Sequence, residues 1–321
     1  MRLDRPLLKL PCRYDAAALA AEVAALPPSA WLPHPGKLPG NDAVPLITPG
    51  GTISNGFAGP MAPTEHLRAC PYIMQIMADI GAVWGRSRLM GLAPGSDVPD
   101  HVDVGYYWRT HLRVHVPIVT EPSVSFTAGG ETVHMAAGEC WVFDTFQMHR
   151  VRNGGSAKRV HLVLDTVGGE RLWDLVAAAQ AGAGSDGAEL VPPGAANGPI
   201  AYEQVNLPEI MSGWEIRCHI DYLLGLAPAG PALDAVAPRL DRFASSWMAV
   251  WAEHGPSPAG LPAYRRLIET VREDLRSLRA SAILLHNQVP LDRALAELIF
   301  LVAVPADRAP AAPAPALAAA R

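Results

Sequence analysis

The 321-residue chain lacks the features that mark several classes of protein. Its four cysteines are scattered, without a Cys-x-x-Cys pair or any other metal-ligand spacing. A chain of this length buries a sizeable core and does not need disulfides to hold it. We therefore predict reduced thiols in the core at all four positions: Cys12, Cys70, Cys140 and Cys218.

The chain also has no large excess of positive or negative charge. Charged residues make up 18% of the chain and the net charge is −5 at pH 7. Surfaces that bind nucleic acid depend on clustered Lys and Arg, which neutralise phosphates. We expect no nucleic-acid partner, and small or neutral partners instead.

Long apolar runs are missing too. No stretch reaches the roughly 18 apolar residues that a membrane span requires. The first residues, MRLDRPLLKLPCRYD, carry charges and prolines where a secretory signal would have an unbroken apolar segment. We expect no membrane association and a cytoplasmic location.

The sequence does contain a series of short β-like runs between residues 87 and 167. Alternating apolar residues, β-branched residues and intervening turn residues are typical of antiparallel strands. Such a density of short runs predicts a sandwich or barrel. The runs are SRLMGL, HLRVHVPIV, SVSFTA, ETVHMA, CWVFD and RVHLVLDTV.

Helices and loops are predicted before this region. Residues 16–26 read as a helix with Asp15 as its N-cap, and a second helix begins after Thr64 and is interrupted near Pro71. Glycine and proline dominate residues 33–63, which predicts a long ordered loop that could cover a small pocket.

After the β-like runs the pattern changes twice. Residues 177–199 have the small-residue, Pro- and Gly-rich composition of a linker. After this segment, apolar residues recur at helical spacing, which predicts a helical bundle. We expect the apolar faces of its helices to form a core and a homodimer surface. The predicted division is 1–86 for N-terminal helices and loops packing on the core, 87–170 for the β core, 171–203 for a linker-like segment, 204–304 for the helical region and 305–321 for a disordered Pro/Ala tail.

The candidate chemistry begins at a His-x-Asp element, His101 and Asp103. Two histidines and one carboxylate form the facial triad that holds a non-haem Fe(II) and leaves coordination positions open. The third ligand should follow some 40 or more residues later, and His149 stands at that distance. His134 is the alternative, although a cross-strand or surface histidine is the ordinary interpretation in the alternating run ETVHM. The competing interpretation is a solvent-exposed turn, because PGSDVPDHVD is rich in turn-forming residues.

A second group of polar residues alternates with apolar ones in HLRVHVPI. An extended strand places His111, Arg113 and His115 on one face, so these side chains would line a pocket if that face points inward. Strand histidines are commonly satisfied by their neighbours, and for His111 and His161 that interpretation is the favoured one.

These residues and their spacing resemble the aspartyl/asparaginyl β-hydroxylase family of Fe(II)/2-oxoglutarate-dependent dioxygenases, closest in pattern to the bacterial hydroxylases of free, proline-type amino acids. Family members carry a ligand histidine, an Arg-x-His on a strand, a Gly-x-x-x-x-Phe-Asp-x-x-x-x-His element and an arginine ten residues beyond. The matching residues here lie within roughly 89–167 and are His101, Arg113, His115, Gly138, Phe143, Asp144, His149 and Arg159.

The resemblance implies a fold and a set of ligands. The fold class would be α+β, with a double-stranded β-helix core of the jelly-roll or cupin-like kind, flanking N-terminal helices and a C-terminal helical bundle. Iron would be held by His101, Asp103 and His149, and Asp103 places the chain with the members that have the full triad. The implied cofactors are Fe(II) and the cosubstrate 2-oxoglutarate, with ascorbate as activator.

The resemblance also assigns the remaining site residues. Arg159 would bind the distal carboxylate of 2-oxoglutarate, with His115 as a second contact. The alternative for Arg159 is a structural ion pair with Asp165 or Asp144.

Arg113 is at the position of the family's substrate-carboxylate arginine, but an inward arginine could equally hold Glu131 or Asp144. Tyr107 and Trp108 either line the substrate pocket or form the mouth of the barrel.

The implied function is hydroxylation of an unactivated C–H bond, with O₂ as oxidant and succinate and CO₂ as co-products. The expected substrate is a free amino acid such as proline or a similar small carboxylate-bearing metabolite. One alternative is β-hydroxylation of aspartyl or asparaginyl residues in a peptide, or of a lipid. A second alternative is a non-catalytic, cupin-like protein that only binds a metabolite.

Overall fold

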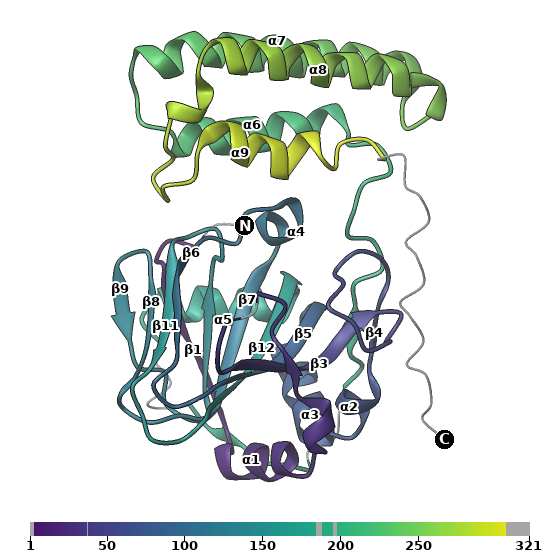
Figure 1. Ribbon diagram of the computed structural model, residues 1–321. Helices are drawn as coiled ribbons and strands as arrows, with labels where there is room; N and C mark the ends of the chain where they lie inside the picture. Colours follow the sequence, from purple (N-terminus) through teal and green to yellow (C-terminus); the bar gives the residue numbers. More distant parts are fainter. Residues whose placement is uncertain (1–2, 37, 184–187, 195–197, 306–321) are drawn as a thin grey trace, which may run out of the picture. The chain divides into compact units, whose positions relative to one another are not determined.

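Eight consecutive strands, β5 to β12, are divided between two antiparallel sheets (Figure 1). Neighbouring strands of the large sheet follow the order β5-β12-β7-β10, and those of the small sheet follow β6-β11-β8-β9. This is the connectivity of a jelly roll, so the predicted α+β class with a double-stranded β-helix core is confirmed. The strands are β5 (Val83–Leu92), β6 (Asp97–His101), β7 (Leu112–Val119), β8 (Val124–Ala128), β9 (Glu131–Val133), β10 (Glu139–Phe143), β11 (His149–Asn153) and β12 (Arg159–Gly168).

The computed structural model describes residues 3–36, 38–183, 188–194 and 198–305. Two compact units divide the chain between Leu207 and Pro208. The first unit contains both sheets, and the described part of the second contains helices. The predicted Pro/Ala tail lies outside the described residues from position 306 onward.

Further strands extend the large sheet on both sides of the jelly roll. β1 pairs with β10, and β3 pairs with β5. The prediction of helices and loops alone over residues 1–86 is therefore wrong, because two long strands lie there. The additional strands are β1 (Leu7–Tyr14), β2 (Leu32–Pro33), β3 (Asn41–Pro49), β4 (Met61–Pro63), β13 (Leu190–Val191) and β14 (Ala201–Tyr202).

Prolines explain why these two strands were missed. A proline inside a run argues against a central strand, because it donates no hydrogen bond to a neighbour. In β1 the pairing register shifts between Leu10 and Arg13, around Pro11, and in β3 it shifts between Pro45 and Ile47. Each proline therefore lies at an irregularity of the ladder, where the missing N–H costs little.

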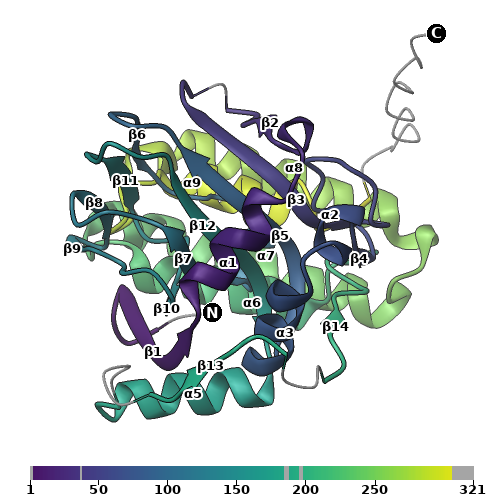
Figure 2. The same ribbon diagram turned by 90° about the horizontal axis from the view of Figure 1, so that it is seen from below.

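Helices cover the outer face of the large sheet (Figure 2). The predicted caps are confirmed, since Asp15 accepts hydrogen bonds from the first turn of α1 and Thr64 caps α2. The chain over 171–203 is not simply a linker, because its described parts include most of α5 and the short strands β13 and β14. The helices of this unit are α1 (Ala16–Ala24), α2 (Glu65–Arg68), α3 (Pro71–Ile80), α4 (Tyr106–Thr110) and α5 (Glu170–Gln180).

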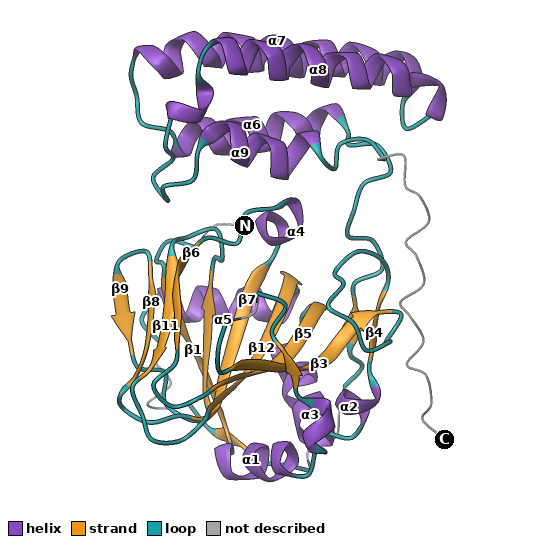
Figure 3. Ribbon diagram, in the orientation of Figure 1, coloured by secondary structure: helices purple, strands orange, loops and turns teal. Residues whose placement is uncertain are grey.

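The second unit is built from helices, as its apolar spacing predicted (Figure 3). Trp247 is fully buried in its core and its indole N–H donates to the carbonyl of Met211. The helices are α6 (Gly213–Leu226), α7 (Pro231–His254), α8 (Leu261–Ser277) and α9 (Leu291–Leu295), followed by a π-helical turn at Ala296–Phe300. Among the described helices, none is both long and apolar enough to cross a bilayer.

The cysteines are all free, and three of them are buried, as predicted. Cys218 is the exception, because it lies on an exposed position of α6. The helical period in GWEIRCHIDYLLGL buries Ile216, His219, Ile220 and Leu223 and leaves position 218 on the opposite side.

Candidate functional site

The inner face of the large sheet carries polar side chains. In the cross-strand register, Arg88 of β5 lies opposite Val163 of β12, which lies opposite His115 of β7. Side chains two positions apart on a strand share a face. The same face therefore receives the other polar residues of these strands, all of them buried: Arg86, Arg113, Arg159, His161 and Asp165.

A cavity of about 600 Å³ lies between this face and the small sheet. The small sheet contributes His101, Phe126 and His149 to its wall. The predicted cover from residues 33–63 is present as part of the wall, although the segment includes β3. Its lining residues are His34, Pro35, Gly36, Leu38, Asn41, Asn55 and Phe57.

His101, Asp103 and His149 lie close together in the wall of this cavity. His101 and His149 are cross-strand partners on β6 and β11, and Asp103 follows β6, where its backbone N–H donates to the carbonyl of Thr145. One ligand atom from each of the three residues lies within 4.8 Å of the others. The structure thus brings the three predicted ligands together, and the sheet register fixes the two histidines opposite each other.

Both histidines have the proton arrangement that a metal ligand needs. The Nδ1 atoms lie 2.8 Å from the carbonyl of Pro99 in His101 and 2.9 Å from that of Gln147 in His149. When Nδ1–H donates to a carbonyl, the lone pair is left on Nε2, which is the usual arrangement around a bound metal. Burial lowers the pKa of His149 to about 4, so its imidazole is neutral at pH 7. The donor set fits Fe(II).

Asp103 is held by Arg113. Arg113 Nη1 donates to Asp103 Oδ2 at 2.8 Å, which leaves Oδ1 for a metal. Burial alone would raise the pKa of Asp103, but the charge of Arg113 opposes burial most strongly, and the net effect is a lowered pKa. His149 and His101 add to this lowering when they are protonated. The carboxylate is therefore ionised and oriented before any metal binds.

Arg113 is already engaged by two carboxylates. Besides Asp103, its Nε donates to Asp165 Oδ1 at 2.7 Å. Burial would lower the pKa of Arg113, but Asp165 and Asp103 together raise it. The structure does not favour the predicted role of substrate anchor, since the guanidinium holds partners on both sides. The carboxylates that Arg113 contacts are Asp103 and Asp165, and not the predicted alternative partners Glu131 and Asp144.

Arg159 and His115 also line the cavity. Arg159 Nη2 donates to His161 Nδ1 at 2.6 Å, so His161 serves to orient the guanidinium. The Nε atom of Arg159 and the Nε2 atom of His115 are buried without a hydrogen-bond partner among the described residues. The ion pair with Asp165 that sequence left open is absent here, because Asp165 faces Arg113 and Arg86 instead.

Burial lowers the pKa of Arg159 to about 9, and burial together with the Arg159 charge lowers that of His115. A guanidinium charged at pH 7 beside orphaned buried polar atoms suits a carboxylate, whose oxygens would accept from both. The residues present therefore fit the distal carboxylate of 2-oxoglutarate.

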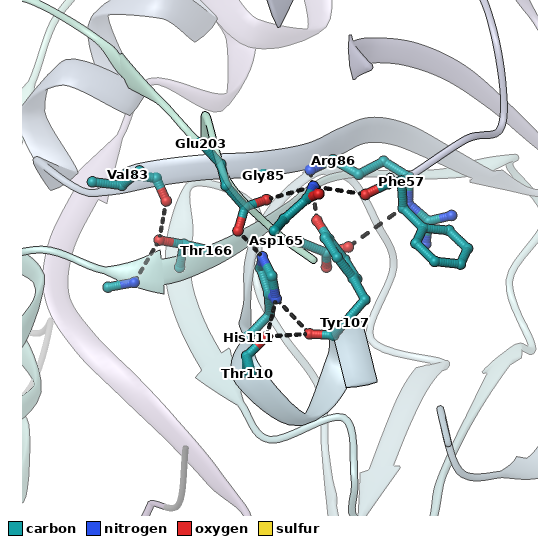
Figure 4. A network of polar contacts seen from close by, with 12 residues as sticks. Phe57, Val83, Gly85, Arg86, Tyr107, Thr110, His111, Asp165, Thr166 and Glu203 are labelled. Carbon is teal, nitrogen blue, oxygen red and sulfur yellow. Dashed lines mark hydrogen bonds and ion pairs between the residues drawn. The ribbon is translucent and has the colours of Figure 1, made fainter. Parts of the chain in front are cut away.

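Tyr107 and Trp108 have separate roles. Trp108 lines the cavity, whereas Tyr107 is buried behind it and accepts a hydrogen bond from the backbone N–H of Arg86 (Figure 4). The Tyr107 ring stacks on His111, whose Nε2 lies 2.9 Å from Glu203. Tyr107 is therefore not a pocket residue. His111 has neighbours at both ring nitrogens, the backbone of Tyr107 at Nδ1 and Glu203 at Nε2, in line with the structural interpretation that the sequence favoured.

Sequence reasoning missed Arg86 and Arg88. Both lie on β5 and line the cavity. The signal was present, because Arg86, Arg88 and Met90 occupy every second position of VWGRSRLMGL and so share one face of an extended strand. The pattern alone could not tell an inward face from an outward one, since alternation of arginine with apolar residues is also typical of a solvated strand.

Comparison with known proteins supports the resemblance. Residues 54–168 match the family model of the aspartyl/asparaginyl beta-hydroxylases. The L-proline cis-3-hydroxylase 1 of a Streptomyces species is 26% identical over 110 residues, which is 33% of this chain and 38% of the relative. The matched part thus spans well under half the length of that relative. The family match over residues 54–168 confirms the resemblance for that part of the chain.

Solved structures with some likeness include a 2-oxoglutarate/Fe(II) oxygenase family protein from Burkholderia pseudomallei. It is 16% identical, with a TM-score of 0.37, over 49% of this chain and 80% of that one. A prolyl-4-hydroxylase from Pseudomonas putida is also 16% identical, with a TM-score of 0.36, over 51% of this chain and 92% of that one. The fold assignment stands on the strand order described above.

Proposed function

We propose that this protein is an Fe(II)/2-oxoglutarate-dependent dioxygenase that hydroxylates a small carboxylate-bearing substrate, with O₂ as oxidant and succinate and CO₂ as co-products. The observation that carries the proposal is the convergence of His101, Asp103 and His149 within 4.8 Å of one another in the wall of a cavity of about 600 Å³. Two histidines and one carboxylate leave coordination positions open for a cosubstrate and for O₂.

When bound, the iron would supply the oxidising chemistry, and the protein would supply position and shelter. Arg113 orients Asp103 through the 2.8 Å hydrogen bond and keeps it ionised. Arg159, oriented by His161, would bind the distal carboxylate of 2-oxoglutarate, with His115 beside it. The burial of these groups excludes water and strengthens each charge-assisted contact.

A free amino acid of the proline type is the substrate class that the name of the Streptomyces relative suggests. The cavity of about 600 Å³ has room for 2-oxoglutarate together with a small substrate. An aspartyl or asparaginyl residue in a peptide is the second candidate, favoured by the description of the matching family.

Oxoglutarate consumption by the purified full-length chain tests the proposal. Fe(II), ascorbate and a panel of free amino acids and short peptides would be supplied, and succinate would be measured. We expect succinate with at least one substrate and, under nitrogen, a metal-to-ligand absorption band when oxoglutarate joins the Fe(II) protein.

Absence of that band together with absence of succinate would favour the non-catalytic alternative. Ascorbate, expected to act as an activator, is tested by omitting it.

A further inference from the structure

Arg88 is a buried cation with no partner of its own. Its side chain is 6% exposed and lines the cavity. Among the described residues, none forms a hydrogen bond or a close ion pair with its guanidinium, in contrast to Arg113 and Arg159. Burial, with Arg86 and Arg113 nearby, lowers the pKa of Arg88 to about 9, so it remains charged at pH 7 at a cost in solvation.

Arg86 lies two positions away on the same strand and the same face. It is 7% exposed, and its Nε lies 3.8 Å from Asp165, which Arg113 already holds at 2.7 Å. Its guanidinium lies 5.6 Å from the ring centre of Trp108 and 5.9 Å from that of Phe57. Arg86 therefore shares one carboxylate with Arg113 and otherwise faces aromatic rings.

The charges around the cavity do not balance. Its lining includes four arginines, namely Arg86, Arg88, Arg113 and Arg159. The carboxylates that face them are Asp103 and Asp165, which leaves two positive charges. The charges of Fe(II) and 2-oxoglutarate would cancel each other, so the excess would remain after both have bound. Burying a charge without a compensating partner is costly in free energy. A ligand that carries negative charge would provide the compensating charge.

A positively charged group on the substrate would find little to bind. Among the described residues that line the cavity, Asp103 is the single carboxylate, and it belongs to the proposed metal site. The other described polar residues of the cover that line the cavity are His34, Asn41 and Asn55. The two amides are neutral, and burial, the largest cause, lowers the pKa of His34 to about 4, so its imidazole is also neutral at pH 7. An ammonium group here would add to the excess of positive charge.

From this juxtaposition we propose that Arg88, with Arg86 beside it, binds the carboxylate of the primary substrate, and that this substrate carries no ammonium group in the pocket. The chemical class is a carboxylate with a neutral body, such as an N-acylated amino acid or a simple carboxylic acid. Trp108, Phe57 and Met90 would contact the body. The inference rests on the proposed function and narrows its substrate, against a free zwitterionic amino acid.

Matched compounds test this inference directly. Proline, leucine and phenylalanine would each be supplied in the free form, the N-acetyl form and the N-acetyl amide form, which lacks the carboxylate. Calorimetry with the full-length protein, both metal-free and with Fe(II) and oxoglutarate under nitrogen, measures binding without turnover. We expect at least one N-acetyl amino acid to bind and its free and amide counterparts to bind roughly ten- to a hundredfold more weakly.

The variants Arg88→Gln and Arg88→Met should weaken that binding by roughly ten- to a hundredfold. Arg152→Gln, on an exposed position of β11, is the matched control and should leave it unchanged. The Fe(II)–oxoglutarate absorption band should persist in the Arg88 variants, which also shows that they fold.

Several outcomes would overturn the inference. If free amino acids bind as tightly as their N-acetyl forms, the substrate does not need to lack an ammonium group. Unchanged affinity in both Arg88 variants would show that Arg88 does not bind the substrate carboxylate. A protein that binds oxoglutarate but none of these compounds would also contradict the proposed substrate class. Failure of the proposed function has a different signature, because the Fe(II)–oxoglutarate band would be missing in the wild-type protein itself.

Discussion

On strands β5, β7 and β12, successive residues alternate between two faces that are equally buried and chemically opposite. The outer face presents Leu89, Val116 and Leu162, each with no exposed surface, and packs on α1, α3 and α5. The inner face presents arginines, histidines and an aspartate that are at most 8% exposed. One sheet thus separates a region that stabilises the fold from a region that is arranged to bind.

The free-energy terms of the two faces differ in sign. Each fully buried aliphatic side chain of the outer face contributes about 1.5–3 kcal/mol. On the inner face, each buried charge costs several kcal/mol in lost hydration, which only well-placed partners offset. Arg113 and Asp165 have such partners, whereas Arg88 does not. A face that keeps an uncompensated cation is explained by a ligand better than by stability.

The largest expected effect comes from the metal site. We expect His149→Ala to abolish oxoglutarate turnover and to weaken Fe(II) binding, because a facial triad that loses one histidine keeps only two ligands. Far-ultraviolet circular dichroism should remain that of the wild type. His134→Ala is the control, since the ring of His134 contacts the backbone of Val124 outside the cluster. Turnover at the wild-type rate in His149→Ala would remove this residue from the site.

The next prediction compares one variant on the inner face of the large sheet with one on its outer face, by both the free energy of unfolding and the affinity for iron. Asp165→Ala leaves Arg86 and Arg113 without their shared carboxylate, and we expect a loss of about 3–5 kcal/mol in the free energy of unfolding. Leu162→Ala on the outer face should cost a comparable 2–5 kcal/mol or so through the cavity it leaves.

Urea unfolding followed by the signal of the β unit gives the two stabilities, and a titration of the folded protein gives oxoglutarate and iron affinity. Only Asp165→Ala should change the affinity for iron, because Arg113 then loses the partner that helps it position Asp103. Equal effects of the two variants on metal affinity would contradict the separation of the faces.

A smaller effect concerns the cosubstrate. Arg159→Met keeps most of the side-chain volume and removes the charge, so the affinity for oxoglutarate should fall by roughly ten- to several-hundred-fold while iron binding is retained. An anaerobic titration that follows the metal-to-ligand band measures this. Arg152→Met serves as the exposed control. If the midpoint of the oxoglutarate titration is unchanged in Arg159→Met, another cation of the cavity binds the distal carboxylate.

The smallest expected effect has the opposite sign. Arg88→Met removes an unpartnered buried charge, and we expect the ligand-free protein to become more stable by about 1–2 kcal/mol. Thermal unfolding of the wild type and the variant measures the difference. Arg113→Met is the matched comparison and should be destabilising, because it strips Asp103 and Asp165 of their cation. A destabilised Arg88→Met would indicate a structural role for this arginine.

Local patterns predicted much of this molecule. Alternation and turn residues predicted six strands of the jelly roll, and the caps at Asp15 and Thr64 predicted helix starts. β6 and β11 were not predicted as strands of their own. β6 reads DVPDH, follows the turn formers PGS and is exposed along much of its length. Edge and polar strands are stabilised by their neighbours and leave little trace in local composition.

The sequence by itself determined which residues have ligand chemistry, since the spacing of His101, Asp103 and His149 is a property of the chain. Their convergence within 4.8 Å was decided by the tertiary structure, through the register that places β6 against β11. The partners of the arginines were decided there as well. A strand pattern states that Arg88, Arg113 and Arg159 share a face, but which of them meets a carboxylate depends on strands far apart in sequence. Such contacts arise only when the sheet has formed, because the charges of distant strands are then brought together out of water.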